Sequence, residues 1–348
     1  MLRTQKALCA VFFLLAFALL PRSAGGWTEE DFQRKPYLRR PLVAVPSSDL
    51  EHERTVVGRR LFRQVRKGDT FLDLARYYGL GFEEMKDANP GVDPWVPPEG
   101  QIVLLPTEWV LPDTKWEGIV VNIPEMRLYY FHPRAKQDEG VRVSTFPVGL
   151  GRTEWKTPRG RFRIRGKTVN PTWVIPESIR RERIQERGWS EVSIPGGSPD
   201  NPLGKHRFEL TLPMYAIHGT NIPWGVGMQV SHGCIRMYPE DIEHLFPQVK
   251  IGTPGEFVYQ PVKVGARDGE IYVEVHRDIY QYTPGLYREA MRLLEKRGWA
   301  EKIDRRRLAR AVEERTGVPM VISRSPETEL VEEEVLELPR PSAALGGG

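Results

Sequence analysis

A cysteine that follows two His-Gly pairs gives this chain its clearest chemical signal. Cys234 is one of two cysteines in the sequence, and the other, Cys9, lies in an apolar N-terminal stretch. His218 and His232 each precede a glycine, and His232-Gly233 runs directly into Cys234. The thiolate is the nucleophilic form of cysteine, and its proton must pass to a base. Histidine is the usual base, because its pKa of about 6.5 lets it accept and return a proton near neutrality.

The neighbours of Cys234 are candidates for the remaining roles. Gly233 has no side chain, so a substrate could approach the amides of Gly233 and Cys234, which would stabilise an oxyanion. Arg236 adds a fixed positive charge, suited to a substrate carboxylate or to bracing the loop. Other interpretations stay open: a buried apolar cysteine, polar histidines without a function, or a metal site of His218, His232 and Cys234. No Cys-x-x-Cys or His-x-x-x-His pair supports the metal site.

The same stretch resembles the signature of the L,D-transpeptidase catalytic domain, often called the YkuD domain. Ile-His-Gly-Thr-Asn at 217–221 and Ser-His-Gly-Cys-Ile-Arg-Met at 231–237 carry the resemblance. Further stretches resemble the periplasmic subgroup that couples proteins or peptides to the cell wall, at 156–160, 170–173 and 200–204. Together these matches span about residues 116–262.

The resemblance implies a cysteine enzyme that acts on peptidoglycan without a metal or organic cofactor. Cys234 would attack the carbonyl that joins the third residue of a stem tetrapeptide, the donor, to its terminal D-alanine. D-Alanine would leave, a thioester would form, and an amine would then take the acyl group. His218 matches the position of the general base and acid. Two alternatives stay open: an L,D-carboxypeptidase with water as the acceptor, and a wall-binding protein with an inactive catalytic domain.

The resemblance also assigns supporting residues. His232 would shape the oxyanion loop and bind the substrate, and Ser231 would cap that loop. Tyr215 begins the strand that delivers His218, and it is a substrate-binding candidate together with Gly219. Several relatives carry serine where this chain has Gly219, so an interaction through that side chain is absent here, though a backbone carbonyl could still orient His218.

Residues 1–25 have the layout of a secretory signal peptide. Basic residues within 1–6 precede an uncharged apolar run over 7–20, and small residues follow. The run is shorter than the roughly 20 residues of a spanning helix. We therefore expect cleavage after Gly25 and a periplasmic or cell-wall-associated protein without a membrane span, although an uncleaved anchor stays open. An exported chain left with one thiol is expected to use it.

The charge balance says little about partners beyond one exclusion. The formal net charge is +4, and the predicted signal peptide holds Arg3, Lys6 and Arg22 without an acid, so the remainder is nearly neutral. Nucleic acid is therefore not an expected partner, since it requires a concentrated basic face. The expected partner is peptidoglycan, bound as stem peptide and as glycan. The amine acceptor stays open between another stem, an envelope protein and a free amino acid.

The remaining pattern predicts a mainly β chain with a small module on either side of the catalytic domain. The plan comprises a signal peptide at 1–25, a linker at 26–61, a LysM module at 62–107, a β-sandwich catalytic domain at 116–264, a short helical extension at 265–322 and a disordered acidic tail at 323–348. The extension is expected to brace the catalytic domain, with a separate activity as the alternative.

Residues 62–107 predict the order strand, helix, helix, strand. One apolar face over 71–78 marks the first helix, a second helix fits 82–88, and a strand fits 101–105. This order, with Gly68-Asp69-Thr70 and Asn89-Pro90, resembles the LysM module. The resemblance implies binding of wall glycan that contains N-acetylglucosamine, and a structural cap without a ligand is the alternative.

The catalytic region is rich in short strands separated by glycine and proline. Strands are expected over 118–123, 126–131, 141–148, 161–165, 215–218 and 256–264, with one short helix over 240–246. Beyond it we expect a strand over 270–276, a helix between Pro284 and Gly298, and a basic helix over 304–315.

Overall fold

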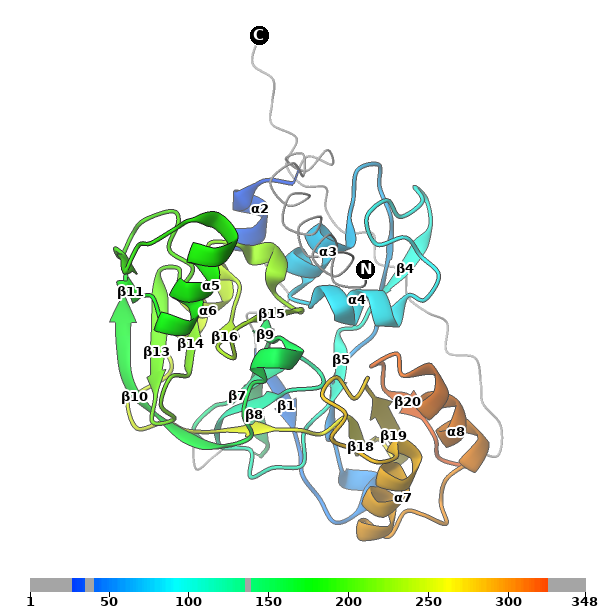
Figure 1. Ribbon diagram of the computed structural model, residues 1–348. Helices are drawn as coiled ribbons and strands as arrows, with labels where there is room; N and C mark the ends of the chain where they lie inside the picture. Colours follow the sequence, from blue (N-terminus) through cyan, green and yellow to red (C-terminus); the bar gives the residue numbers. More distant parts are fainter. Residues whose placement is uncertain (1–26, 35–40, 135–138, 325–348) are drawn as a thin grey trace, which may run out of the picture.

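The computed structural model describes residues 27–34, 41–134 and 139–324 (Figure 1). The predicted signal peptide at 1–25 lies outside the described residues, as do all but the first two residues of the predicted tail at 323–348. Within the described ranges, no helix combines the length and the apolar character required to cross a bilayer.

A nine-stranded mixed sheet forms the centre of the molecule, with the order β1-β8-β7-β6-β17-β10-β13-β14-β16. Its strands are β1 (Leu42–Ala44), β6 (Gly118–Asn122), β7 (Arg127–Phe131), β8 (Val141–Pro147), β10 (Gly160–Val169), β13 (His206–Leu210), β14 (Ala216–His218), β16 (Ile235–Arg236) and β17 (Pro254–Val258). Neighbours are antiparallel except for β17 with β6 and β14 with β16. The predicted mainly β fold is confirmed.

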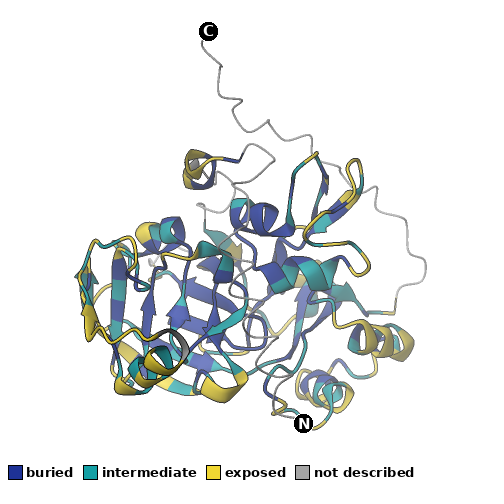
Figure 2. Cartoon of the chain, turned by 45° about the horizontal axis from the view of Figure 1, so that its top comes forward, coloured by how far each residue is buried: buried dark blue, intermediate teal, exposed yellow. Residues whose placement is uncertain are grey.

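Both halves of the sheet contribute side chains to one hydrophobic core, in agreement with the predicted β-sandwich fold. Val121 of β6 and Leu128 of β7 enter this core from one half of the sheet. Phe208 of β13 and Ile217 of β14 enter it from the other half, and all four side chains are fully buried. The helix α6 (Pro239–Leu245) adds further apolar side chains to the same cluster. Figure 2 shows these strands as a buried interior.

The catalytic region contains one helix that the sequence pattern did not predict. This helix, α5 (Glu177–Arg187), reads Glu-Ser-Ile-Arg-Arg-Glu-Arg-Ile-Gln-Glu-Arg. The expectation of a single helix was wrong. The charged residues of α5 are distributed around the helix, so it has no continuous apolar face that the sequence pattern could reveal. The other short elements are β9 (Leu150–Gly151), the 3-10 helix η2 (Thr153–Trp155), β11 (Trp173–Val174), β12 (Ser193–Ile194), η3 (Pro223–Gly225) and β15 (Gln229–Ser231).

Most of the predicted linker is part of the fold, so that expectation is corrected for its described residues. β1 pairs with β8 at the edge of the large sheet, and β2 (Val56–Gly58) pairs with β5 (Glu108–Val110). The elements α2 (Glu29–Arg34) and η1 (Leu50–His52) occupy the same region. Three-residue strands are too short to produce a visible alternation, which explains why the pattern appeared to be a linker.

Residues 61–105 contain the predicted order strand, helix, helix, strand, as β3 (Leu61–Gln64), α3 (Phe71–Tyr78), α4 (Phe82–Ala88) and β4 (Ile102–Leu105). Thr70 caps α3, because its hydroxyl accepts from the Asp73 amide at 3.2 Å. Gly79 ends α3 with a left-handed conformation, φ +65°. The element order is confirmed, whereas the resemblance to LysM stays a prediction.

This four-element unit shares its core with the large sheet. Phe71 of α3 lies in the same hydrophobic cluster as Tyr129 of β7. The guanidinium of Arg76, 1% exposed, lies 3.1 Å from Glu240 of α6 and 2.7 Å from Glu29 of α2. Removing one partner of the buried Arg76–Glu240 pair costs about 3–5 kcal/mol. The unit is therefore fixed to the catalytic domain rather than tethered beside it.

The C-terminal part is a small α+β unit with its own core. It consists of β18 (Val262–Arg267), β19 (Glu270–Val275), β20 (Met320–Val321), α7 (Leu286–Lys296) and α8 (Arg305–Glu314). The single strand predicted over 256–264 is in fact two strands, β17 and β18, separated around Pro261. β18 crosses position 264, so the predicted domain boundary falls within a strand. The strand predicted over 270–276 is present as β19.

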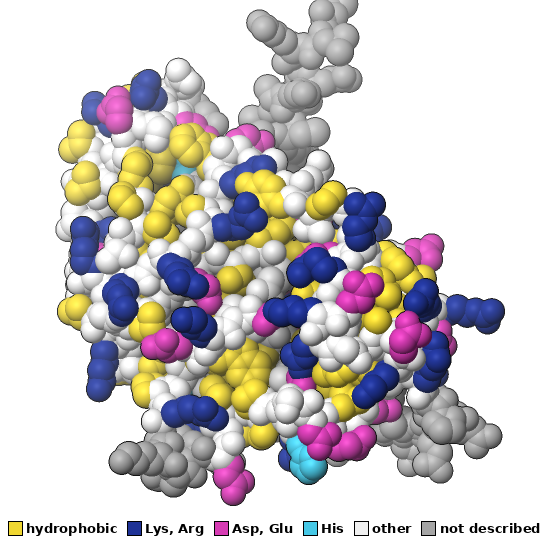
Figure 3. Space-filling view, turned by 90° about the horizontal axis from the view of Figure 1, so that it is seen from below, with side chains coloured by type: hydrophobic (Ala, Val, Ile, Leu, Met, Phe, Trp, Pro, Cys, Tyr) yellow, Lys and Arg dark blue, Asp and Glu magenta, His cyan; other side chains and the backbone are white. Residues whose placement is uncertain are grey.

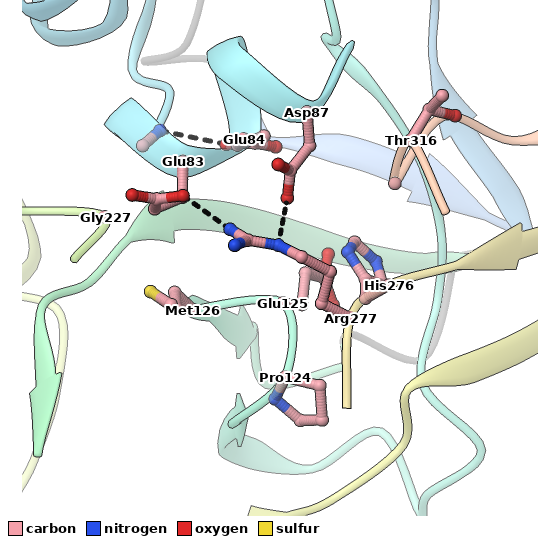
Figure 4. Close-up of a pocket in the computed structure, with 12 residues that line it drawn as sticks. Glu83, Glu84, Asp87, Pro124, Glu125, Met126, Gly227, His276, Arg277 and Thr316 are labelled. Carbon is pink, nitrogen blue, oxygen red and sulfur yellow. Dashed lines mark hydrogen bonds and ion pairs between the residues drawn. The ribbon is translucent and has the colours of Figure 1, made fainter. Parts of the chain in front are cut away.

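The three parts of the molecule meet at a small cavity of about 20 Å³, room for one water molecule (Figure 4). Arg277, which follows β19, reaches α4 there. Its Nε lies 2.8 Å from the carboxylate of Asp87, and its Nη2 donates to Glu83. These ion pairs connect the C-terminal unit to the N-terminal one across the Pro124–Met126 turn of the catalytic domain.

On the face shown in Figure 3, lysine and arginine side chains are spread among acidic and apolar ones. The described residues on that side form no concentrated basic patch. This mixture agrees with the low net charge of the sequence.

Candidate active site

Strand pairing brings Cys234 and His218 to the same face of the sheet edge. β14 ends at His218, and β16 begins directly after Cys234. The two strands pair in parallel with His218 opposite Arg236. Side chains two residues apart in a strand project from the same face. Cys234 and His218 are therefore on one face, while Ile217 and Ile235 point into the core.

His218 is buried and held by the backbone. Its Nδ1 lies 2.7 Å from the carbonyl oxygen of Gly219, so Nδ1–H donates and Nε2 stays an acceptor. The Gly219 carbonyl thus provides the backbone orientation that the absence of a serine side chain requires. Burial lowers the pKa of His218 to about 3, with the positive charges of Arg236 and Arg207 acting in the same direction. The imidazole is therefore neutral at physiological pH and able to accept a proton.

The Cys234 thiol is half-buried beside an exposed loop. Its sulfur lies 3.7 Å from the carbonyl oxygen of Met214. Burial raises the pKa of the Cys234 thiol, and a backbone hydrogen bond from Ala216 opposes this effect. Within the described residues no hydrogen bond joins the thiol to His218. The resting pair is thus a neutral thiol and a neutral imidazole, and proton transfer would accompany attack on a substrate.

The Ser231 hydroxyl bridges the turn that leads to the thiol. Its hydroxyl donates to the carbonyl of Cys234 at 2.6 Å and accepts from the amide of Gly233 at 3.0 Å. The Gly233 amide, expected to be an oxyanion donor, is therefore already engaged within the turn. Of the two amides considered from the sequence, that of Cys234 is the remaining candidate.

Only glycine fits at position 233. Its φ of +104° is unfavourable for residues with a side chain. A Cβ atom there would also lie 2.8 Å from Cε1 of Tyr215. Tyr215 is half-buried, and its ring covers the turn next to the thiol. The sequence reasoning placed Tyr215 in the substrate site, and the structure places its ring against Gly233.

His232 is held by side chains rather than by backbone. Its Nε2 lies 2.6 Å from a carboxylate oxygen of Glu182 of α5 and 2.9 Å from Nη2 of Arg152. The Nη2 group donates to the other carboxylate oxygen of Glu182 at 3.1 Å. The ring centroids of Trp155 and His232 lie 5.3 Å apart. Burial lowers the pKa of His232, and the hydrogen bond with Glu182 opposes this effect. Sequence reasoning missed Arg152 and Glu182, since no local pattern connects them to the His-Gly-Cys motif.

Two further residues outside the predicted set support the turn. The Thr157 hydroxyl donates to the carbonyl of Gly233 at 3.1 Å. The buried hydroxyl of Tyr280 donates to the carbonyl of Gly151 at 2.7 Å and accepts from the Thr157 amide at 3.1 Å. Thr157 lies in the 156–160 stretch that contributed to the resemblance. Tyr280 follows β19 in the C-terminal unit, and nothing in its local sequence points to the site.

The three residues of the alternative metal site do not gather their ligand atoms within the described part of the chain. A group that does so lies elsewhere and consists of Glu125, Glu274 and His276. The ammonium of Lys263 lies 2.8 Å from the first carboxylate and 2.7 Å from the second. This cluster is therefore a buried ion-pair network in which lysine supplies the positive charge.

The chain is similar to known proteins over this region and beyond it. A family model described as the L,D-transpeptidase catalytic domain (YkuD) matches residues 117–264. The "Probable L,D-transpeptidase YcfS" of Escherichia coli K12 is 33% identical over 94% of this chain and 99% of its own length. The "Probable L,D-transpeptidase ErfK/SrfK" of Salmonella typhimurium is 36% identical over 72% of this chain and 81% of its own. A solved L,D-transpeptidase from Mycobacterium smegmatis aligns over 41% of this chain and 58% of its own, at 20% identity and a TM-score of 0.31.

Proposed function

This chain belongs to the L,D-transpeptidase family, and from that premise we propose that it transfers a peptidoglycan stem peptide through a thioester on Cys234. One observation carries the proposal. Cys234 and His218 project from one face of paired strands, with the His218 ring oriented so that Nε2 can accept a proton. A cysteine with a purely structural role would not require a buried neutral imidazole on the adjacent strand.

In the first half-reaction the thiol proton passes to Nε2 of His218 as sulfur attacks the carbonyl carbon between the third stem residue and D-alanine. The developing oxyanion takes a hydrogen bond from the Cys234 amide. The carbon–nitrogen bond then breaks, and His218 returns its proton to the leaving amine. Free D-alanine departs, and the stem tripeptide stays on Cys234 as a thioester.

In the second half-reaction an amine attacks the thioester carbonyl. His218 accepts a proton from the amine, the carbon–sulfur bond breaks, and the proton returns to sulfur. An amide forms, and the Cys234 thiol is restored. The acceptor is another stem, an envelope protein or a free amino acid, and water in its place would make the enzyme a carboxypeptidase.

The other site residues hold and shape the groove. His232, fixed by its neighbours, hydrogen-bonds the substrate and positions the turn, and Ser231 keeps that turn closed. Tyr215 lines the approach to the thiol, and Gly219 orients His218 through its backbone carbonyl. Arg236 holds a stem carboxylate or braces the loop, the two roles expected from the sequence.

The test is product analysis with a disaccharide-tetrapeptide donor and glycine as the amine. The wild type should release free D-alanine and form the tripeptide–glycine amide in preference to free tripeptide, because a groove that excludes water favours the amine. Cys234→Ala should release no D-alanine. If only tripeptide forms with every amine tried, the protein is a carboxypeptidase.

We further propose that the protein works outside the cytoplasm and that its four-element unit at 61–105 binds wall glycan. The signal-like sequence at 1–25 and the resemblance to LysM support this. Because the unit shares its core with the catalytic sheet, deletion would not be a clean test. Sedimentation of the Cys234→Ala chain with purified sacculi should be weakened by Trp95→Ala, which alters an exposed aromatic ring of the unit. Absence of any sedimentation would favour a structural cap.

A further inference from the structure

Two arginines flank His218 across the edge of the sheet. Arg207 of β13 lies opposite His218, and His218 lies opposite Arg236 of β16. Cross-strand partners project from the same face. The next row along the strands, Phe208, Ile217 and Ile235, points into the core. The polar row therefore lies on the opposite face, the one that also carries Cys234.

Neither arginine has an anionic partner among the described residues. Both side chains are only half-exposed, and the Nε atom of each is buried without a hydrogen-bond acceptor. Two other arginines that are buried or half-buried have a carboxylate within reach. Arg76 has Glu240 at 3.1 Å, and Arg152 has Glu182 at 3.1 Å. Partly buried guanidinium groups are normally paired, because burying an uncompensated charge is costly.

The unpaired charges are close enough to act on the reacting groups. Both guanidinium groups contribute to the low pKa of His218, after the larger effect of burial. Both also oppose the rise in the pKa of the Cys234 thiol that burial causes. A bound anion here would thus lie next to the thiol and the base, within the part of the site that a substrate must enter.

We propose that Arg207 and Arg236 form a carboxylate-binding site that selects the donor stem peptide. This rests on the function proposed above. Guanidinium groups bind carboxylates through paired, charge-assisted hydrogen bonds, and their planar fork fixes the orientation of the carboxylate. The donor offers two carboxylates beside the bond to be broken: that of the terminal D-alanine and that on the side chain of the third residue. Arg236 would then bind substrate rather than brace the loop.

The test measures acylation of Cys234 by three donors. One tetrapeptide carries free carboxylates, a second carries a D-alanine amide, and a third has the side-chain carboxylate of its third residue amidated. In the wild type, amidation of the recognised carboxylate should lower kcat/KM by about 10- to 100-fold, as expected for charge-assisted hydrogen bonds. The donor that loses rate identifies which carboxylate is bound.

The variants separate recognition from general damage. Arg207→Gln and Arg236→Gln should each lower kcat/KM for the donor with free carboxylates by a similar factor of about 10- to 100-fold. They should lower kcat/KM much less for the donor whose recognised carboxylate is amidated, so that the preference for the free carboxylate disappears. Arg207→Lys should keep part of the preference, since it retains the charge without the fork. Arg161→Gln changes an exposed position on β10 of the same sheet and should leave the rates with all three donors unchanged.

Three outcomes would overturn the proposal. The wild type could fail to discriminate between free and amidated donors, the glutamine variants could retain the discrimination, or they could slow all donors equally while thermal melting shows intact folding. If no donor acylates Cys234 in the wild type, the proposed function itself fails, and this inference fails with it.

Discussion

The two histidines of the site differ in what holds them. His218 is buried, ends a paired strand and donates to the backbone carbonyl of its own neighbour. His232 is half-buried in a turn and contacts two side chains, Arg152 and Glu182, the second from a separate helix. A ring fixed by backbone and strand pairing keeps one geometry, which suits proton transfer. A ring fixed by long side chains can adjust when substrate enters, which suits binding and orientation.

The first prediction compares replacement of each histidine by alanine. His218→Ala should slow single-turnover acylation of Cys234 by roughly 10²–10⁴-fold, the usual loss of a general acid–base. His232→Ala should slow it less, because its role is orientation. Rapid-quench measurement of D-alanine release gives both rates. The reverse order would make His232 the base.

The second prediction concerns stability in acid. The folded pKa of His218 is about 3, below the value of about 6.5 in an unfolded chain. Between these values the unfolded state binds a proton that the folded state excludes, so stability falls as pH falls, by up to about 1.4 kcal/mol per pH unit. His218→Gln should remove this loss in urea unfolding measured between pH 7 and 4. His232→Gln should also reduce the loss of stability in acid, but by less, because Glu182 favours the protonated ring of His232. Equal slopes in wild type and His218→Gln would contradict the burial of a neutral His218.

The third prediction tests whether the turn that carries His232 depends on remote support. Tyr280→Phe leaves the Gly151 carbonyl and the Thr157 amide without their hydrogen-bond partner. This loss should lower the free energy of unfolding by about 1–3 kcal/mol. Misplacement of the Gly233 turn should also lower the rate of acylation roughly tenfold with KM little changed. Tyr282→Phe, which alters an exposed neighbouring ring, is the matched control. A Tyr280→Phe variant that is destabilised but acylates at the wild-type rate would limit Tyr280 to a structural role.

The fourth and smallest effect is expected at Glu182. Glu182→Gln removes a group that raises the pKa of His232, so the NMR titration of this ring should move to lower pH. Acylation should slow only a few-fold, since the His218–Cys234 pair is untouched. Glu177→Gln, an exposed acid on the same helix, should change neither measurement. An unchanged titration would mean that the contact between Glu182 and His232 is absent in solution.

The same contrast explains what the sequence could predict. Elements with strong local signals were predicted nearly to the residue. α3 has the Thr70 cap and Gly79 at its end, and β14 lies within the strand predicted over 215–218. The His-Gly-Cys motif and the Gly219 carbonyl are also local, so the central part of the site follows from 215–237 alone.

Features that depend on distant parts of the chain were not predicted. α5 has no apolar face to reveal it, and its Glu182 reaches His232 only through the fold. Tyr280 lies in another structural unit, and its hydroxyl reaches the site across more than a hundred positions of sequence. Likewise, residues 61–105 and the large sheet share one hydrophobic core. The hydrophobic periodicity of a single segment does not show which other segment it packs against.

The most direct test of the account weighs the intact protein after mixing with a disaccharide-tetrapeptide that ends in D-alanine. We expect one added stem tripeptide per chain, located on Cys234 by peptide mapping, with release of one D-alanine. A donor that already lacks its fourth residue has no leaving group and should give no adduct. Absence of any adduct, with Cys234 reduced and reachable by a small alkylating agent, would contradict the assignment of Cys234 as the nucleophile.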